Sequence, residues 1–276
     1  MSAPYTPAMG DRITDLLTTW KLTAAAAELV PRLAAMGQDE ALAVIAEVFE
    51  HEAGTRAERR VDRLRKASRL PPAKSFDTLE RSRVPKPALL KVEDLARGDF
   101  LDRGGNVLVF GLPGVGKSHL ACALGHALVE AGRSVFFTPT YQVVQTLLAA
   151  RRDLCLPKAL RSLDVFDAII LDDLGYVQQT PDEAEVLFTL MAERYERRSL
   201  IITSNLVFSE WGRIFQSPMM TAAAIDRLVH HAVIIEIDRS SVRAEEAKRR
   251  NGKRDKDQGA SSPEGAEPPT TTTPPR

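Results

Sequence analysis

The chain has 276 residues, of which 44% are hydrophobic and 27% charged, as expected for one medium globular domain with additions or for two small domains. Its 37 lysines and arginines balance 37 aspartates and glutamates, so the net charge indicates no class of partner. Two cysteines are too few for a disulfide scaffold, and no apolar run reaches the length of a membrane span. We therefore expect a cytoplasmic protein with no membrane association.

The first part of the chain, residues 1–91, is predicted to be a helical region that binds DNA or a protein partner. Up to about residue 54, apolar side chains recur at helical spacing, as in Ile13, Leu16, Leu17 and Trp20. From about residue 55 the sequence becomes basic. Prolines at positions 71, 72, 85 and 87 divide this basic stretch into a helix and an irregular connector.

One helical stretch indicates a nucleic-acid partner on its own chemistry. If residues 56–70 form a helix, an apolar seam of Ala57, Val61 and Leu64 lies on one side and a stripe of five cations lies on another. These five cations, the basic stripe, are Arg56, Arg59, Arg60, Arg63 and Lys66. Such a stripe can bind the phosphates of duplex DNA with strong salt dependence and little regard for base sequence. Alternatively, the basic stripe is only a solvated face of the helix, or it binds the acidic residues between positions 39 and 52.

Residues 92–245 alternate short β-branched or aromatic runs with longer helical patterns, which predicts a mostly parallel sheet covered by helices on both faces. The expected strands are Asn106–Phe110, Ser134–Thr138, Ala168–Leu171, Leu200–Thr203 and Val233–Ile237. The expected helices are Lys117–Glu130, Tyr141–Arg151 and Asp182–Arg197. Residues 246–276 are expected to be disordered, because they have too few large apolar side chains to offset the entropy lost on ordering.

Residues 111–118 match the phosphate-loop pattern G-x-x-x-x-G-K-[ST] and lie between a predicted strand and a predicted helix. Glycines let backbone N–H groups surround phosphates, Lys117 supplies a positive charge, and the Ser118 hydroxyl can ligate Mg²⁺. We therefore expect ATP and Mg²⁺ to bind here. The expected contacts are Gly111, Leu112, Pro113, Gly114, Val115, Gly116, Lys117, Ser118 and His119. A Rossmann loop is disfavoured because the pattern G-x-G-x-x-G is absent.

Other polar side chains follow the predicted strands at the sheet edge where open α/β folds place ligands. Asp172 is expected to hold hydrated Mg²⁺ and Asp173 to polarise the attacking water, unless the pair only caps the following turn. Asn205 is expected to contact the γ-phosphate or the water, unless it only turns the chain. Arg227 precedes the last strand and is a candidate to stabilise phosphoryl charge in a neighbouring subunit, an ion pair with Asp226 being the alternative.

The order of these motifs resembles the IstB-type transposition helper ATPases, which are AAA+ proteins similar to the DnaC-type helicase loaders. The resemblance covers roughly residues 12–245 and rests on GLPGVGKSHLA, IILDDLGY, IITSN, AIDRL and a final Ser-x-Arg. It implies an AAA+ core preceded by a small all-α region. It also implies that Lys117 and Ser118 bind phosphate and Mg²⁺, and that Asp172 and Asp173 are the Walker B pair.

The resemblance implies three further roles. Asn205 would be the first sensor of nucleotide state, Arg227 the arginine that acts on a neighbour's ATP, and Arg243 the second sensor arginine that contacts the nucleotide. The chain departs from the family at the last of these, because the family usually has Ser-Tyr-Arg where this chain has Ser241-Val242-Arg243.

The resemblance also implies a function. Proteins of this kind assemble into ATP-dependent oligomers on duplex DNA and help a partner transposase act at a target site. We therefore expect an ATPase whose partners are duplex DNA, further copies of itself and a cognate transposase. A DnaC-like replicative helicase loader is the alternative, and a P-loop enzyme acting on a small molecule is a third class.

Several other features are expected to be structural. His230 and His231 have no cysteine or histidine at metal-ligand spacing, so no zinc site is expected. Cys122, on the helix after the phosphate loop, is expected to be a small core residue. Trp20 and Trp211 are expected to pack in apolar helical patterns.

Overall fold

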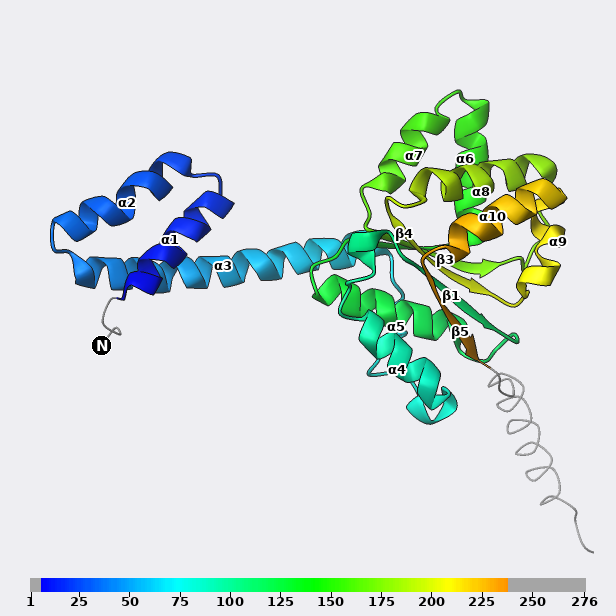
Figure 1. The fold of residues 1–276 in the computed structure, drawn as a ribbon, viewed down its shortest axis with the longest axis horizontal. Helices are drawn as coiled ribbons and strands as arrows, with labels where there is room; N and C mark the ends of the chain where they lie inside the picture. The colour runs from blue at the N-terminus through cyan, green and yellow to red at the C-terminus, as the bar shows by residue number, and fades with distance from the viewer. Residues whose placement is uncertain (1–5, 238–276) are drawn as a thin grey trace, which may run out of the picture.

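A computed structural model describes residues 6–237, and the predicted disordered tail and Arg243 lie outside these residues. The N-terminal part consists of three helices, α1 (Pro7–Thr19), α2 (Thr23–Ala35) and α3 (Asp39–Ser68). Figure 1 shows α1 and α2 as a hairpin beside the first half of α3. This unit has a small apolar core of its own, formed by Ile13, Leu17, Ala26, Leu42 and Ala46.

The helix α3 is 30 residues long and joins this hairpin to the α/β part of the molecule. Acidic residues occupy its first turn and basic residues its last. These charges interact favourably with the helix dipole and so stabilise the helix. It ends where Arg69 adopts a left-handed conformation, just before two prolines. In Figure 1 the first half of α3 projects away from the α/β part, so only its second half contacts the sheet and its helices.

The segment that follows α3 was predicted to be an irregular connector, and this prediction is wrong in one respect. Residues Lys86–Leu95 form helix α4, flanked by the short 3₁₀ helices η1 (Arg81–Arg83) and η2 (Leu101–Arg103). Pro85 and Pro87 start α4 instead of breaking it, because the first turn of a helix does not need the missing N–H. Leu70, Val84 and Val92 are buried in the same apolar cluster as the central sheet. Residues from about position 70 onward therefore share a core with the sheet.

A five-stranded parallel sheet forms the centre of the α/β part, as predicted. Its strands are β1 (Asn106–Gly111), β2 (Val135–Pro139), β3 (Ala168–Leu174), β4 (Ser199–Ser204) and β5 (Ala232–Ile237). They are arranged in the order β2-β3-β4-β1-β5, and every neighbouring pair is parallel. The strand β3 continues beyond the predicted Leu171 and includes both aspartates.

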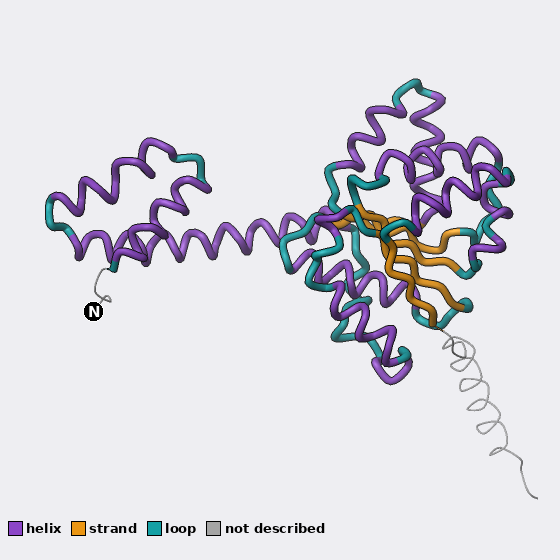
Figure 2. The backbone as a smooth tube through the Cα atoms, in the orientation of Figure 1, coloured by secondary structure: helices purple, strands orange, loops and turns teal. Residues whose placement is uncertain are grey.

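Helices cover both faces of this sheet (Figure 2), which confirms the predicted layers. The helix α5 (Lys117–Glu130) and α4 pack on one face. The other face carries α6 (Thr140–Arg152), α7 (Leu156–Asp164), α8 (Pro181–Arg194), η3 (Phe208–Glu210), α9 (Gly212–Phe215) and α10 (Pro218–Val229). No helix among the described residues is long and apolar enough to cross a membrane.

Two helices on the second face differ from the prediction. The helix α7 was not predicted, although its leucines pack against the apolar cluster of this face beside α6 and α8, because its pattern is only nine residues long. The helix α8 ends at Arg194, three residues before the predicted Arg197, since Tyr195 is extended and Glu196 is left-handed. The Arg194 guanidinium is buried and donates to the carbonyl oxygens of Leu163 (3.0 Å) and Ser199 (3.1 Å).

Candidate nucleotide site

The phosphate loop leaves the carboxyl end of β1, between β4 and β5, and enters α5, so it lies at the carboxyl edge of the sheet. Gly111 passes so close to β5 that an added Cβ atom would lie 2.6 Å from the carbonyl oxygen of Ile237. Gly116 has φ +101°, a conformation that side chains other than glycine rarely adopt. These two positions give the glycines of the sequence motif a steric explanation.

Lys117 is buried and its ammonium group is held inside the loop. Its Nζ atom donates to the carbonyl oxygens of Gly111 (2.8 Å) and Leu112 (3.0 Å). The positive charge is therefore fixed at the start of α5, where the helix also presents unpaired N–H groups. This is an arrangement that attracts phosphate.

The two aspartates of β3 occupy different environments and are joined by one residue of β4. Asp172 is buried and accepts a hydrogen bond of 2.6 Å from the Thr203 hydroxyl. The same hydroxyl accepts a 2.9 Å hydrogen bond from the backbone N–H of Asp173. The pairing of β3 with β4 is irregular here, and Asp173 is exposed with φ +57°. Thr203 was not among the predicted site residues, and its hydroxyl links the Asp172 carboxylate to the backbone of Asp173.

A cavity of about 520 Å³ lies beside the phosphate loop, a size typical of small-molecule sites. Residues 113–119, Asp173 and Asn205 line one side of it. Asn205 takes its position from Ser204, whose hydroxyl donates to Leu174 O (2.9 Å) and accepts from the N–H of Leu206 (3.1 Å). The cavity thus brings together the loop, Asp173 and Asn205, which lie far apart in the sequence.

The opposite wall of the cavity was not predicted, because it comes from the supposed connector. It consists of Lys74, Thr78, Leu79, Glu80, Arg83 and Val84. His119 joins this wall to the phosphate helix, since its Nε2 lies 3.0 Å from Ser75 O and 3.2 Å from Thr78 Oγ1. His119 was predicted to contact the nucleotide, and its ring lines the cavity while hydrogen-bonding to the connector.

Arg83 lines this wall and carries one unsatisfied donor. Its Nε pairs with Glu80 at 2.7 Å, whereas its Nη1 is buried and has no hydrogen-bond partner within residues 6–237. A buried guanidinium N–H without an acceptor costs free energy. The glycine loop, Lys117 and the Arg83 side chain give the cavity the donors and the positive charge that the phosphates of a nucleotide require.

An Arg83→Met variant is expected to bind ADP about tenfold more weakly, because one charge-assisted hydrogen bond is worth about 1.5 kcal/mol or more. Isothermal titration calorimetry measures this affinity. Arg81→Met is the matched control, since Arg81 is two residues away, exposed and paired with Glu93 at 2.7 Å. Equal affinities for the two variants would contradict a contact between Arg83 and the nucleotide.

Comparison with known proteins identifies the family. The model of the IstB-like ATP binding proteins matches residues 16–250. The chain belongs to this family. An insertion sequence ATP-binding protein of Sinorhizobium fredii is 49% identical over 210 residues, which are 75% of this chain and 70% of the relative. The IS21 ATP-binding protein of Pseudomonas aeruginosa is 36% identical over 201 residues, 73% of this chain and 76% of the relative.

Solved structures confirm the predicted AAA+ fold of this IstB-like protein. The replication initiator DnaA bound to AMPPCP and single-stranded DNA gives a TM-score of 0.53 at 15% identity, covering 63% of this chain and 52% of that chain. DnaI gives a TM-score of 0.51 at 18% identity, covering 62% and 95% respectively. At these identities the similarity extends to the fold alone.

Arg227 of the IstB-like protein is not among the residues that line the cavity. Its Nη1 donates to the Ala223 carbonyl at 3.1 Å, and its guanidinium lies 5.1 Å from the centre of the Phe188 ring. The predicted alternative, a pair with Asp226, is not among the ion pairs of the described residues. The arginine is half-buried on α10, away from the nucleotide site of its own chain.

The basic stripe lies on α3 and divides into two groups. Arg56 pairs with Glu52 at 2.6 Å and stacks 4.3 Å above the Trp20 ring, while Arg60 donates to the Gly132 carbonyl at 3.3 Å. The other three cations are exposed and form no hydrogen bond or ion pair within residues 6–237; they are Arg59, Arg63 and Lys66. Arg56 and Arg60 therefore stabilise the fold, and the remaining three are available to a partner.

Cys122 and Trp211 are core residues, as predicted. Both side chains are fully buried. Burial raises the pKa of the Cys122 thiol to about 12, although Lys74 acts in the opposite direction. The thiol therefore stays protonated at neutral pH and takes no part in chemistry.

Proposed function

We propose that this IstB-like protein is a cytoplasmic, Mg²⁺-dependent ATPase that assembles on duplex DNA as an ATP-dependent oligomer and assists a partner transposase at its target site. The observation that carries the ATPase proposal is the Asp172–Thr203–Asp173 arrangement at the edge of the nucleotide cavity. The transposition proposal is supported by relatives that are named insertion sequence ATP-binding proteins.

Different residues of the site have different roles in ATP hydrolysis. Lys117 and the backbone N–H groups of the loop hold the phosphates, and the Ser118 hydroxyl with the buried Asp172 carboxylate would hold Mg²⁺. When bound, Mg²⁺ neutralises charge on the phosphate oxygens. The exposed Asp173 carboxylate accepts a proton from the attacking water, and Asn205 orients that water by hydrogen bonding.

Binding to duplex DNA would use the three available cations of the basic stripe. They are exposed on a rigid helix, and consecutive members are three or four residues apart, so they face the same side. Phosphates of a duplex are regularly spaced, and a rigid row of cations can neutralise several of them without reading bases.

Replacing Arg59, Arg63 and Lys66 together with glutamine is expected to weaken duplex binding at least tenfold at low salt. It should also make the slope of log affinity against log salt concentration shallower by about 3, because each lost phosphate contact releases about one counterion fewer. Fluorescence anisotropy with ATP present, on a labelled duplex at several salt concentrations, measures both quantities.

The control variant replaces three exposed arginines that are each paired with a carboxylate one turn away: Arg32, Arg97 and Arg213. It removes the same charge but leaves the basic stripe intact. An equal loss in both variants would show that net charge, rather than α3, attracts the DNA. Absence of duplex binding by the natural protein at low salt would contradict the transposition proposal and favour a helicase loader.

Oligomerisation is proposed from the position of Arg227, which lies away from its own nucleotide cavity. If Arg227 acts on a neighbouring subunit, inactive Arg227→Ala and Lys117→Ala subunits should complement each other. Mixed in equal amounts, they should recover about a quarter of the natural ATPase rate, because one in four head-to-tail interfaces pairs an intact loop with an intact arginine.

The control for this experiment is the ATPase rate of each variant alone at the same total protein concentration. Adding Arg227→Ala to a subunit that already carries Lys117→Ala gives a double variant that cannot complement either. Recovery with the single variants but not with the double variant supports a shared site. Failure of the single variants to recover, with mixed oligomers verified by native mass spectrometry, would give Arg227 a role within its own chain.

A further inference from the structure

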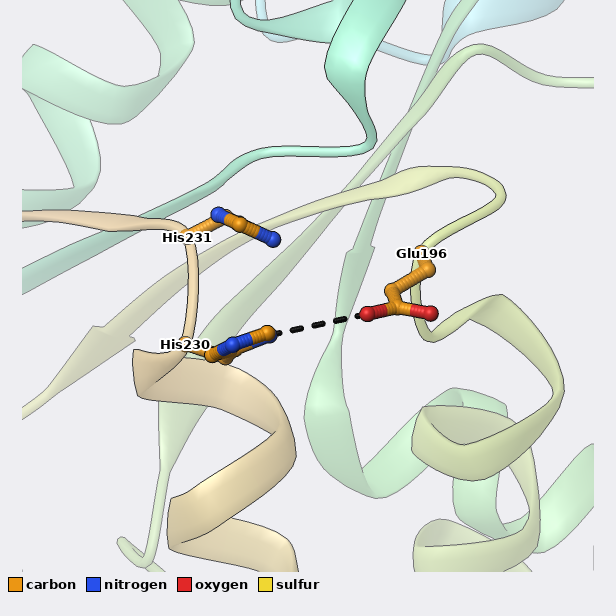
Figure 3. A group of neighbouring side chains, drawn as sticks. All are labelled: Glu196, His230 and His231. Atoms are coloured by element: carbon orange, nitrogen blue, oxygen red, sulfur yellow. Dashed lines mark ion pairs between the residues drawn. The ribbon is translucent and has the colours of Figure 1, made fainter.

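A second group of polar side chains lies at the opposite edge of the sheet from the nucleotide site. Glu196 is in the turn between α8 and β4, whereas His230 and His231 join α10 to β5. Both turns precede their strands, and all strands are parallel, so the group lies at the amino edge of the sheet. Figure 3 shows the two imidazole rings on one side of the chain and the Glu196 carboxylate facing them.

The three side chains are close enough to share an ion. Their potential ligand atoms all lie within 4.8 Å of one another, and the closest approach of Glu196 to His230 is 3.6 Å between Oε1 and Nδ1. The centres of the two histidine rings are 4.2 Å apart. All three residues are exposed, so water and ions reach them from solvent.

The backbone beneath the group is fixed by a buried residue, Asn106 at the start of β1. Its N–H donates to His231 O and its Nδ2 to Leu228 O, both at 3.1 Å. Its Oδ1 accepts the N–H of Leu200 at 2.9 Å. One side chain thus ties together the end of α10, the start of β5 and the start of β4, the segments that carry or adjoin the group.

Two further contacts orient the side chains. The Tyr195 hydroxyl lies 3.0 Å from Nδ1 of His230 and so restricts the orientation of that ring. Gly104, at φ +60°, packs against the backbone of Glu196, so closely that an added Cβ would be 2.9 Å from Glu196 C. The group is therefore held at a defined place rather than on a loose loop.

We propose that Glu196, His230 and His231 form a binding site for a divalent transition-metal ion of the zinc class. Two imidazoles and one carboxylate are a ligand set that zinc accepts, with water in the fourth position. Tetrahedral bonds of about 2.0–2.1 Å place ligand atoms about 3.3 Å apart. Rotation of the exposed side chains would be needed to bring the ligand atoms from within 4.8 Å to that spacing. Magnesium prefers oxygen ligands and is not expected to bind here.

The sequence offered no sign of this site, because the third ligand is 34 positions before His230. The pair alone has no partner at the usual spacing of zinc motifs, and the fold supplies Glu196 through the packing of the α8–β4 turn beside α10. The inference does not depend on the proposed ATPase function, since the two sites lie at opposite edges of the sheet.

The test uses the full chain without a polyhistidine tag, in the absence of nucleotide and with Cys155→Ser as the background, since an exposed thiol is itself a potential zinc ligand. Calorimetric titration with zinc chloride is expected to give one ion per chain, and magnesium chloride is expected to give no heat. Cobalt(II) is expected to show visible absorption of a tetrahedral site, at the same stoichiometry.

His231→Ala and Glu196→Gln are each expected to lower zinc affinity at least tenfold and to abolish the cobalt absorption. His51→Ala, which removes an exposed histidine from α3, is expected to change neither. The melting temperature of each variant without metal, compared with that of the background protein, shows whether it is folded. Zinc affinity that is unchanged in folded His231→Ala, or lowered as much by His51→Ala, would overturn the proposal, as would absence of binding to the background protein.

Discussion

An Asp173→Asn variant is expected to turn over ATP about 100-fold more slowly than the natural protein, while its affinity for ATP changes less than about threefold. Asp173 lines the cavity with an exposed carboxylate, whereas the neighbouring Asp172 is buried. Asparagine keeps the size of the side chain and the backbone N–H that bonds to Thr203, and it loses the ability to take a proton. The chemical step should therefore fail while binding persists. Steady-state phosphate release and calorimetry measure the two quantities.

Asp153→Asn is the control for this change, because Asp153 is exposed and is not among the residues that line the cavity. It is expected to leave both quantities unaltered. A trapped ATP complex should also preserve any oligomer that depends on ATP, which analytical ultracentrifugation detects. Normal turnover by the Asp173→Asn variant would show that another group activates the water.

A Thr203→Val variant is expected to lose about 2–4 kcal/mol of unfolding free energy and about 100-fold in ATP turnover. Valine has nearly the same shape as threonine, but it leaves the buried Asp172 carboxylate without its 2.6 Å donor and the Asp173 N–H without its acceptor. Asp173 has a left-handed backbone that this contact holds in place. Its release would move the carboxylate from its working position. Urea unfolding and steady-state turnover measure the two losses.

Thr203→Ser retains the hydroxyl and is expected to stay within about 1 kcal/mol in unfolding free energy and within about threefold in turnover. Comparing the valine and serine variants separates the contribution of the Thr203 hydroxyl from that of its methyl group. If the valine and serine variants had the same turnover, Thr203 would have no part in positioning Asp173. If only stability fell, the hydroxyl would serve the fold and not the site.

The features that the sequence predicted correctly are those encoded by neighbouring residues. The phosphate loop is eight consecutive residues, and each strand of the sheet is a short run rich in apolar side chains, mostly β-branched or aromatic. The start of α5 at Lys117 and its end at Glu130 were predicted to the residue, because the helix follows a fixed motif. Local chemistry determines all of these features.

The features that escaped prediction depend on contacts between distant segments. Nothing in the sequence around Arg83 shows that it lies against residues 113–119, and the prolines on either side of it suggested an irregular loop. Thr203 has the sequence context of a strand end, and its bridging role exists only because β4 pairs with β3 beside the aspartates. The buried Arg194 at the end of α8 is a similar case, since its hydrogen-bond partners lie on other segments.

The helix α5 carries the phosphate loop at one end and meets α3 at the other, where Glu130 pairs with Arg65 at 2.6 Å. Because α3 is 30 residues long, it spans about 45 Å, and its first half extends beyond any contact with the sheet. A tilt of about 10° at the Arg65 contact would swing the far tip, about 39 Å away, through roughly 7 Å. If bound phosphates shift α5 slightly, the length of α3 would convert that shift into a larger displacement of the N-terminal hairpin.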